Sequence, residues 1–380
     1  MRTWAALSVV VIGVCVFLFS GGFERPPIDS VQRGFRGTGM AEVENPRILA
    51  AKFAENGVPE PQPPADPGGE RATEVYQNVQ VLTDLSAEQF NRVMASITEW
   101  VAPEEQGCAY CHNVENMADG SMYTYKVARR MLQMTRHINA DWQSHVGNAA
   151  EGGAGVTCYT CHRGQPVPTN IWFNDPGRAH TAGLAGNPAG QNGPGPEVGL
   201  ASLPSDPFGP YLKGDGAEVR VTSSTALPEG NRSSIKQTEW TYSLMVHFAN
   251  SLGVNCTYCH NTRQFAAWRE STPARTGAWY GLRMTRGLNN AFLEPLGEVY
   301  PSYRLGSLGD APKVNCATCH QGAYKPLYGA QVIKDHPELA GPGGPAAVAP
   351  APGTHAPVPA APAPAPAPAA SIVKPLAAAR

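Results

Sequence analysis

Cys108-Ala109-Tyr110-Cys111-His112 is the first of four copies of the pattern Cys-x-x-Cys-His in this chain. The pattern is the attachment signature of a c-type haem, because its two thiols can bond the two porphyrin vinyl groups as thioethers. The histidine that follows is then held beneath the iron as the proximal ligand. The other three copies are Cys158/Cys161/His162, Cys256/Cys259/His260 and Cys316/Cys319/His320.

The four signatures together predict four covalently bound haem c groups. They use eight of the nine cysteines of the chain. Disulfides, a zinc site or a redox dithiol are the alternatives, but none of them requires a histidine directly after every second cysteine. Covalent haem attachment takes place outside the cytoplasm, so the signatures also imply that the chain is exported.

Length and composition agree with a chain whose core is completed by cofactors. The 380 residues include 40 Gly and 36 Pro, and only 16% of them are charged. Haems bring large apolar faces, so such a chain needs fewer core side chains than its length suggests. The formal net charge of −2 argues against nucleic acid as a partner.

Residues 1–23 are expected to form an N-terminal membrane anchor or a signal peptide. The apolar run from Trp4 to Phe19 is longer than a usual signal-peptide core and close to the ~20 residues of a membrane span. Arg2 would remain on the inner side by the positive-inside rule. A cleaved signal is the alternative, because Ser20 and Gly22 would suit a signal peptidase; we favour a retained transmembrane anchor.

Helices and signatures alternate after an N-terminal arm. Residues 24–72 are rich in Pro, Gly and charge, and we expect them to form an extended arm. Residues 73–170 form the first dihaem half, in which each signature follows a helix. The first helix begins at a capping box of Ser86 and Gln89. The second is expected from Tyr123 to Trp142, where apolar residues recur at helical spacing.

The same order returns in the second part of the chain. Residues 171–234 are Gly/Pro-rich and form an irregular connecting segment. Residues 235–330 form the second dihaem half, with a helix from Gln237 to Leu252 and another from Thr272-Pro273 to about Phe292. Residues 331–380 become Pro/Ala-rich, and we expect them to form a disordered tail.

An internal duplication explains this order. Met134-Thr135-Arg136 of the first half matches Met284-Thr285-Arg286 of the second. We therefore expect a mainly α fold with long irregular loops, namely a multihaem cytochrome c fold of two dihaem halves related by a pseudo-twofold axis.

Each haem iron also needs a distal ligand, and methionines are the better candidates for most of them. Met94 and Met245 lie on predicted helices, 14 and 11 residues ahead of Cys108 and Cys256. Met131 or Met134 could serve the second haem. Four bis-histidine haems would need four of the six histidines outside the signatures. These six are His137, His145, His180, His247, His336 and His355.

Several stretches of residues 23–335 resemble the tetrahaem cytochrome subunit of photosynthetic reaction centres in purple bacteria and related phototrophs. The resemblance implies that Met94, Met131 and Met245 are the distal ligands opposite His112, His162 and His260. It also implies a bis-histidine fourth haem, with His320 proximal and His145 reaching across from the first half. The similar stretches are Gly34–Gly37, Ala95–Val101, Val127–Thr135, Gly155–Gly164, Ser251–His260 and Cys316–Gly322.

The resemblance implies an electron carrier rather than an enzyme. Such a subunit lies on the periplasmic face of the bacterial photosynthetic inner membrane, on the reaction centre L and M subunits. It re-reduces the photo-oxidised bacteriochlorophyll special pair with electrons from a small soluble cytochrome c or a high-potential iron–sulfur protein. Six-coordinate irons agree with this role because they leave no open position for a substrate.

The sequence departs from the family at two points, and two other classes of multihaem protein are alternatives. Gly22 stands where some family members carry a lipidated cysteine, which favours a peptide anchor, and the Pro/Ala tail extends past the usual end. A membrane-anchored tetrahaem quinol dehydrogenase would use bis-histidine haems, which the histidine count disfavours. A multihaem reductase would need a five-coordinate haem with an open distal pocket.

An acidic collar around the first signature could steer a lysine-rich donor. The alternative is an ordinary solvated surface. The collar consists of Glu99, Glu104, Glu105 and Glu115.

Overall fold

The computed structural model describes residues 2–20, 27–31, 42–176, 195–219 and 235–341. Within these ranges the chain is mainly helical, with long loops, as predicted. The two strands β1 (Asp29–Val31) and β2 (Glu42–Glu44) pair antiparallel, with Ser30 opposite Val43. His180, His355 and the repetitive Pro/Ala segment fall outside the described residues.

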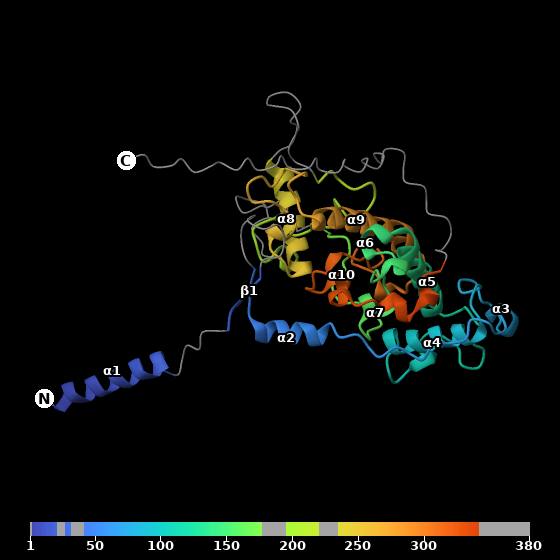
Figure 1. Ribbon diagram of the computed structural model, residues 1–380, viewed down its shortest axis with the longest axis horizontal. Helices are drawn as coiled ribbons and strands as arrows, with labels where there is room; N and C mark the ends of the chain where they lie inside the picture. The colour runs from blue at the N-terminus through green and yellow to red at the C-terminus, as the bar shows by residue number, and fades with distance from the viewer. Residues whose placement is uncertain (1, 21–26, 32–41, 177–194, 220–234, 342–380) are drawn as a thin grey trace, which may run out of the picture. The chain divides into compact units, whose positions relative to one another are not determined.

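The α-helices lie in the order shown in Figure 1: α1 (Arg2–Ser20), α2 (Pro46–Glu55), α3 (Ala72–Val75), α4 (Ala87–Val101), α5 (Tyr123–Asp141), α6 (Gln143–Val146), α7 (Cys158–His162), α8 (Ile235–Leu252), α9 (Pro273–Leu288), α10 (Cys316–His320) and α11 (Val332–Asp335). Short 3₁₀ or π turns lie between them: η1 (Gly107–Tyr110), η2 (Ala149–Glu151), η3 (Pro196–Val198), η4 (Cys256–Tyr258), η5 (Asn289–Leu293), η6 (Glu294–Glu298), η7 (Ser302–Arg304), η8 (Pro326–Gly329) and η9 (Pro337–Leu339).

The four long helices predicted before the signatures are confirmed as α4, α5, α8 and α9. The capping box of α4 is formed in both directions: the Ser86 hydroxyl accepts a bond from the Gln89 N–H, and the Gln89 side chain accepts one from the Ser86 N–H, both at 3.2 Å. This exchange satisfies donors that the first turn of a helix leaves unpaired. α8 ends before Gly253, whose φ of +62° suits glycine.

The helix α1 covers the apolar N-terminal run. Among the residues that the structure describes, we find no helix with the length and apolar character that a membrane crossing requires. The predicted transmembrane anchor is therefore not confirmed.

The N-terminal arm contains a helix, so the prediction of an extended conformation is wrong for residues 46–55. Asn45 caps α2, because its side-chain oxygen accepts a bond from the Arg47 N–H at 3.0 Å. Pro46 occupies the first helical position, where its missing N–H costs nothing. The Asn45-Pro46 pair was the sequence signal that could have identified this helix.

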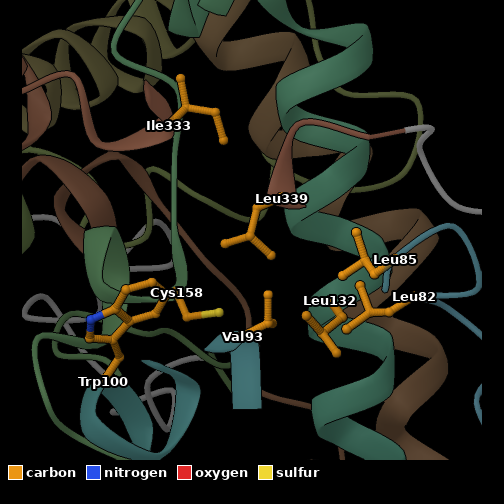
Figure 2. Close-up of a cluster of buried hydrophobic side chains, with 8 residues drawn as sticks. All are labelled: Leu82, Leu85, Val93, Trp100, Leu132, Cys158, Ile333 and Leu339. Atoms are coloured by element: carbon orange, nitrogen blue, oxygen red, sulfur yellow. The ribbon is translucent and has the colours of Figure 1, made fainter. Parts of the chain in front are cut away.

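The first half is built around a core of buried side chains on α4, α5 and α7 and in two further segments. Val93 and Trp100 come from α4, and Leu132 comes from α5. Figure 2 shows the sulfur of Cys158 pointing toward Val93. The full core is Leu82, Leu85, Val93, Trp100, Leu132, Cys158, Ile333 and Leu339.

Residues 331–341 close this core, so the prediction of a disordered tail from residue 331 is wrong for them. Ile333 and Leu339 are each only 1% exposed. Glu338 forms a buried ion pair with Arg92 of α4, at 2.8 Å. The segment has few apolar residues, and they form a pattern too short to show helical periodicity.

The described part of the connecting segment also contributes core, rather than merely linking the halves. Phe208, Tyr211 and Leu212 are buried against Leu244 of α8 and Leu282 of α9. The three residues stand at i, i+3 and i+4, but Gly209 and Pro210 lie between them, which is why the sequence suggested only an irregular linker.

Candidate haem-attachment sites

The four signatures adopt two local conformations. The first and third lie at the 3₁₀ turns η1 and η4, whereas the second and fourth form the one-turn helices α7 and α10. In α7 the backbone N–H of Thr157 donates to the Thr160 hydroxyl, and in α10 that of Asn315 donates to the Thr318 hydroxyl, each at 3.0 Å. The residue before the first cysteine therefore caps the start of each of these short helices.

All four signature histidines are oriented by the same hydrogen bond. In each, Nδ1 lies 2.8–3.0 Å from a backbone carbonyl oxygen. A carbonyl can only accept, so Nδ1 must carry the hydrogen and Nε2 keeps its lone pair for a metal. The pairs are His112–Met117, His162–Gln165, His260–Phe265 and His320–Ala323.

His145, outside the signatures, makes the same bond. Its Nδ1 lies 2.9 Å from the carbonyl oxygen of Gly277, and its ring centre is 6.2 Å from that of His320. An imidazole nitrogen bonds a first-row metal at about 2 Å and lies roughly 1 Å from its own ring centre, so two imidazoles sharing one iron have centres about 6 Å apart. The observed separation fits an iron held between His145 and His320.

His137 and His247 face different groups. His137 accepts from the Trp142 indole N–H through Nε2 at 3.2 Å and pairs with Asp141 through Nδ1 at 2.6 Å. His247 lies 3.2 Å from the Ser251 hydroxyl through its own Nε2. In both rings the nitrogen that would face a metal contacts the protein instead, as expected for packing roles.

The family model described as "Photosynthetic reaction centre cytochrome C subunit" matches residues 24–340. The chain belongs to this family. Membership implies covalently bound haem c, electron transfer in the photosynthetic reaction centre, and association with the membrane that holds it. The resemblance drawn from the sequence is thus confirmed.

Three reaction-centre cytochromes illustrate the similarity. The photosynthetic reaction center cytochrome c subunit of Rubrivivax gelatinosus is 53% identical over 91% of this chain and 92% of its own length. That of Thermochromatium tepidum is 47% identical over 88% and 80%, respectively. That of Roseobacter denitrificans is 43% identical over 88% and 92%.

The distal methionines predicted for this reaction-centre cytochrome lie half-buried on three different helices. Met94 is on α4, Met131 on α5 and Met245 on α8. Met134 and Met284 pack against the buried cluster of Ile138, Val156, Leu288 and Phe292, and Met94 and Met245 likewise pack against the clusters that contain Trp100 and Leu244. Packing alone therefore does not separate ligand from core methionines, and the assignment of the three distal methionines remains a prediction.

The second and fourth signatures lie against each other. The structure joins Cys161 of α7 to Cys319 of α10 by a disulfide, with Cα atoms 4.4 Å apart. The sequence predicts a haem thioether at each of these residues instead. A sulfur in a disulfide cannot also bond a vinyl carbon, so the two assignments exclude each other, and the thioethers at this pair remain a prediction.

Burial sets the charge state of the site residues. It raises the pKa of Cys111, Cys158 and Cys259 to about 11, which keeps these thiols neutral. It also lowers the pKa of His145, and it lowers the pKa of His320 to about 4 together with the nearby His145. A neutral imidazole is the form that binds a metal, so the reaction-centre cytochrome holds this pair in the state that ligation needs.

His336, which lies outside the signatures, is expected to make the folded protein less stable in acid. Burial and the nearby Arg92 lower its pKa to about 4, against about 6.5 for an unfolded histidine. Between these values the unfolded chain binds the extra proton, so stability falls as pH falls from 6.5 to 4. We expect His336→Phe to reduce this loss by up to about 3 kcal/mol.

Denaturant unfolding of both proteins at pH 8 and at pH 4.5 measures the effect. The difference at pH 8 reports the packing change alone, because His336 is neutral there in both states. Equal losses between the two pH values in the native protein and the variant would contradict the prediction.

Proposed function

We propose that the chain holds four haem c groups and passes electrons from a soluble periplasmic donor to the photo-oxidised special pair. The donor is a small cytochrome c or a high-potential iron–sulfur protein. The L and M subunits of the reaction centre hold the chain at the periplasmic face of the membrane. The main support is the shared Nδ1–carbonyl bond of the four signature histidines, which leaves four Nε2 atoms available to iron.

The chain's own side chains would hold each group in a closed coordination sphere. Each signature supplies two thioether sulfurs and a proximal imidazole, and Met94, Met131, Met245 and His145 supply the distal ligands. Bound haem c contributes a one-electron change at its iron, whose potential a methionine ligand raises. Two protein ligands on every iron exclude substrate and suit a carrier.

The two halves are proposed to be related by a pseudo-twofold axis. The first and third signatures share one local conformation, and the second and fourth share the other. Residues after the second and fourth signatures also match, because Arg163 and Gln321 both adopt left-handed conformations, with φ of 51° and 47°.

Contacts between the signature segments support a relay with the second and fourth sites in the middle. α4 packs against both η1 and α7, and α7 packs against α10. α8 packs against α10 and leads through Gly253 into η4. We therefore propose the spatial order first, second, fourth, third.

Flash-induced absorbance changes in native membranes test the function. With the haems poised reduced, we expect oxidation in the haem α-band to match the recovery of the bleached pigment pair. Recovery of the pigment while these haems remain reduced would contradict the donor role.

Peptide mapping of the membrane-purified protein tests the cysteine assignment. We expect the peptides that contain Cys161 and Cys319 each to carry a haem, with four haems per chain in the intact mass. Digestion without reductant is required, so that a disulfide survives. A peptide pair linked through these two cysteines would contradict four-haem attachment.

The acidic collar is predicted to steer the donor. Its four glutamates are exposed, as are Val114 and Met117 beside the first signature, at 65% and 49%. Because exposed charges are screened within about 10 Å at 0.1 M salt, we expect the donor on-rate to fall about tenfold or more as salt rises from low to physiological levels. Stopped-flow or flash kinetics at several salt concentrations measure this rate.

Glu104→Gln/Glu105→Gln is expected to weaken the salt dependence. Glu294→Gln, an exposed glutamate outside the collar, is the matched control and should leave it unchanged. An on-rate independent of salt in the native protein would contradict steering.

A further inference from the structure

The helices α5 and α9 place the same residues in the same contacts. Leu132 of α5 and Leu282 of α9 are each 8% exposed. Three residues further on, Thr135 and Thr285 are buried, and each hydroxyl donates to the carbonyl four residues earlier, at 2.9 and 2.8 Å.

One turn further, an asparagine ties each helix to the strand-like segment before a signature. The Asn139 side chain donates to the Val156 carbonyl at 2.9 Å and accepts from the Val156 N–H at 2.8 Å. Asn289 does the same with Val314, at 3.0 and 2.9 Å. These segments lead into the second and fourth signatures. The position of α5 relative to the second site is therefore equivalent to that of α9 relative to the fourth.

The two helices differ where a distal ligand is expected. The carbonyl that receives the Thr135 hydroxyl belongs to Met131, whereas the one that receives the Thr285 hydroxyl belongs to Gly281. At the position where α5 carries the proposed ligand of the second haem, α9 therefore carries no side chain.

His145 lies over that glycine. A Cβ added at Gly281 would lie 2.5 Å from Cε1 of His145 and 3.0 Å from both ring nitrogens. The same imidazole is held by the carbonyl of Gly277, one turn earlier in α9. α6, which carries His145, packs directly against α9. The ring that faces His320 thus occupies the volume that a side chain at position 281 would fill.

We propose that Gly281 determines the distal ligand of the fourth haem: it removes the methionine position of α9 and lets His145 enter from the first half. This inference rests on the proposed function, because it requires a haem at the fourth signature. A glycine inside a helix is unfavourable relative to alanine, and the contact with His145 gives a reason for keeping one here.

His145→Ala and the double variant His145→Ala/Gly281→Met test the proposal in the complete haem-loaded protein. We expect the single variant to keep four haems but lose the bis-histidine signal in low-temperature electron paramagnetic resonance, and to bind carbon monoxide when reduced. In the double variant, the introduced methionine should occupy the distal position. Carbon monoxide binding should then disappear, and the near-infrared methionine–iron band should gain intensity by about one third, from three His/Met haems to four.

Gly281→Ala gives a second test, and Gly287→Ala in the same helix is the matched control. A Cβ at Gly287 would make an ordinary 3.7 Å contact with Trp142. We expect the bis-histidine signal to be lost or shifted only in Gly281→Ala, with the haem count unchanged.

The failures of the two proposals are distinguishable. A native protein without four haems or without a bis-histidine signal would overturn the proposed function. A native protein with four haems and a bis-histidine signal would support the proposed function. The inference about Gly281 would still be overturned if the double variant bound carbon monoxide as His145→Ala does. An unchanged bis-histidine signal in Gly281→Ala would also overturn it.

Discussion

Methionine in place of Arg92 is expected to lower the free energy of unfolding by about 3–5 kcal/mol, because removal of one partner leaves a buried charge unpaired. The Arg92 guanidinium bonds both carboxylate oxygens of Glu338, at 2.9 and 2.8 Å. It also donates to the carbonyls of Gln62, Pro63 and Asp335. Denaturant unfolding of the purified subunit measures the change.

Two further variants separate the buried charge from the loss of side-chain packing. Arg92→Met/Glu338→Met removes both charges and should be less destabilised than Arg92→Met alone. Arg263→Met removes an arginine whose side chain is 79% exposed and 3.7 Å from Glu270, so we expect a change within about 1 kcal/mol. A loss of similar size in Arg92→Met and Arg263→Met would contradict the role assigned to the buried pair.

Leucine in place of Met131 is expected to open the second haem to external ligands. Leucine fills a similar volume but cannot coordinate iron, so the reduced protein should bind one carbon monoxide per chain. The midpoint potential of one haem should also change, since axial ligands set haem potentials over a range of about 0.8 V. Carbon monoxide difference spectra and a redox titration of the α-band measure both effects.

Met134→Leu is the matched control on the same helix. Met134 packs in the cluster with Ile138 and Phe292, so its replacement should leave carbon monoxide binding absent and the four potentials close to native. Carbon monoxide binding in Met134→Leu, and none in Met131→Leu, would assign the distal ligand to Met134 instead.

Local signals in the sequence predicted the local structure well. The capping box at Ser86 and the Thr272-Pro273 pair each marked the start of a helix that the structure contains. These signals succeed because caps and helical periods depend on residues within a few positions of one another. The Asn45-Pro46 pair belonged to the same class of signal and identifies α2 in the same way.

Contacts between distant residues could not be predicted from periodicity or spacing. Arg92 and Glu338 are 246 positions apart, and His145 and Gly277 are 132 apart. Neither contact can be detected from the spacing of apolar residues, because each depends on how helices pack after they form. The pairing of His145 with His320 was implied by family resemblance, and the geometry that supports it appeared only in the structure.

Closure of the first core by residues 331–341 affects the order in which the chain can fold. Ile333, Leu339 and Glu338 complete a core whose other members all precede residue 159. A chain synthesised from its N-terminus therefore has the first two signatures available long before their final packing is possible. We therefore expect the core around α4 and α7 to remain open until the last segment has been made.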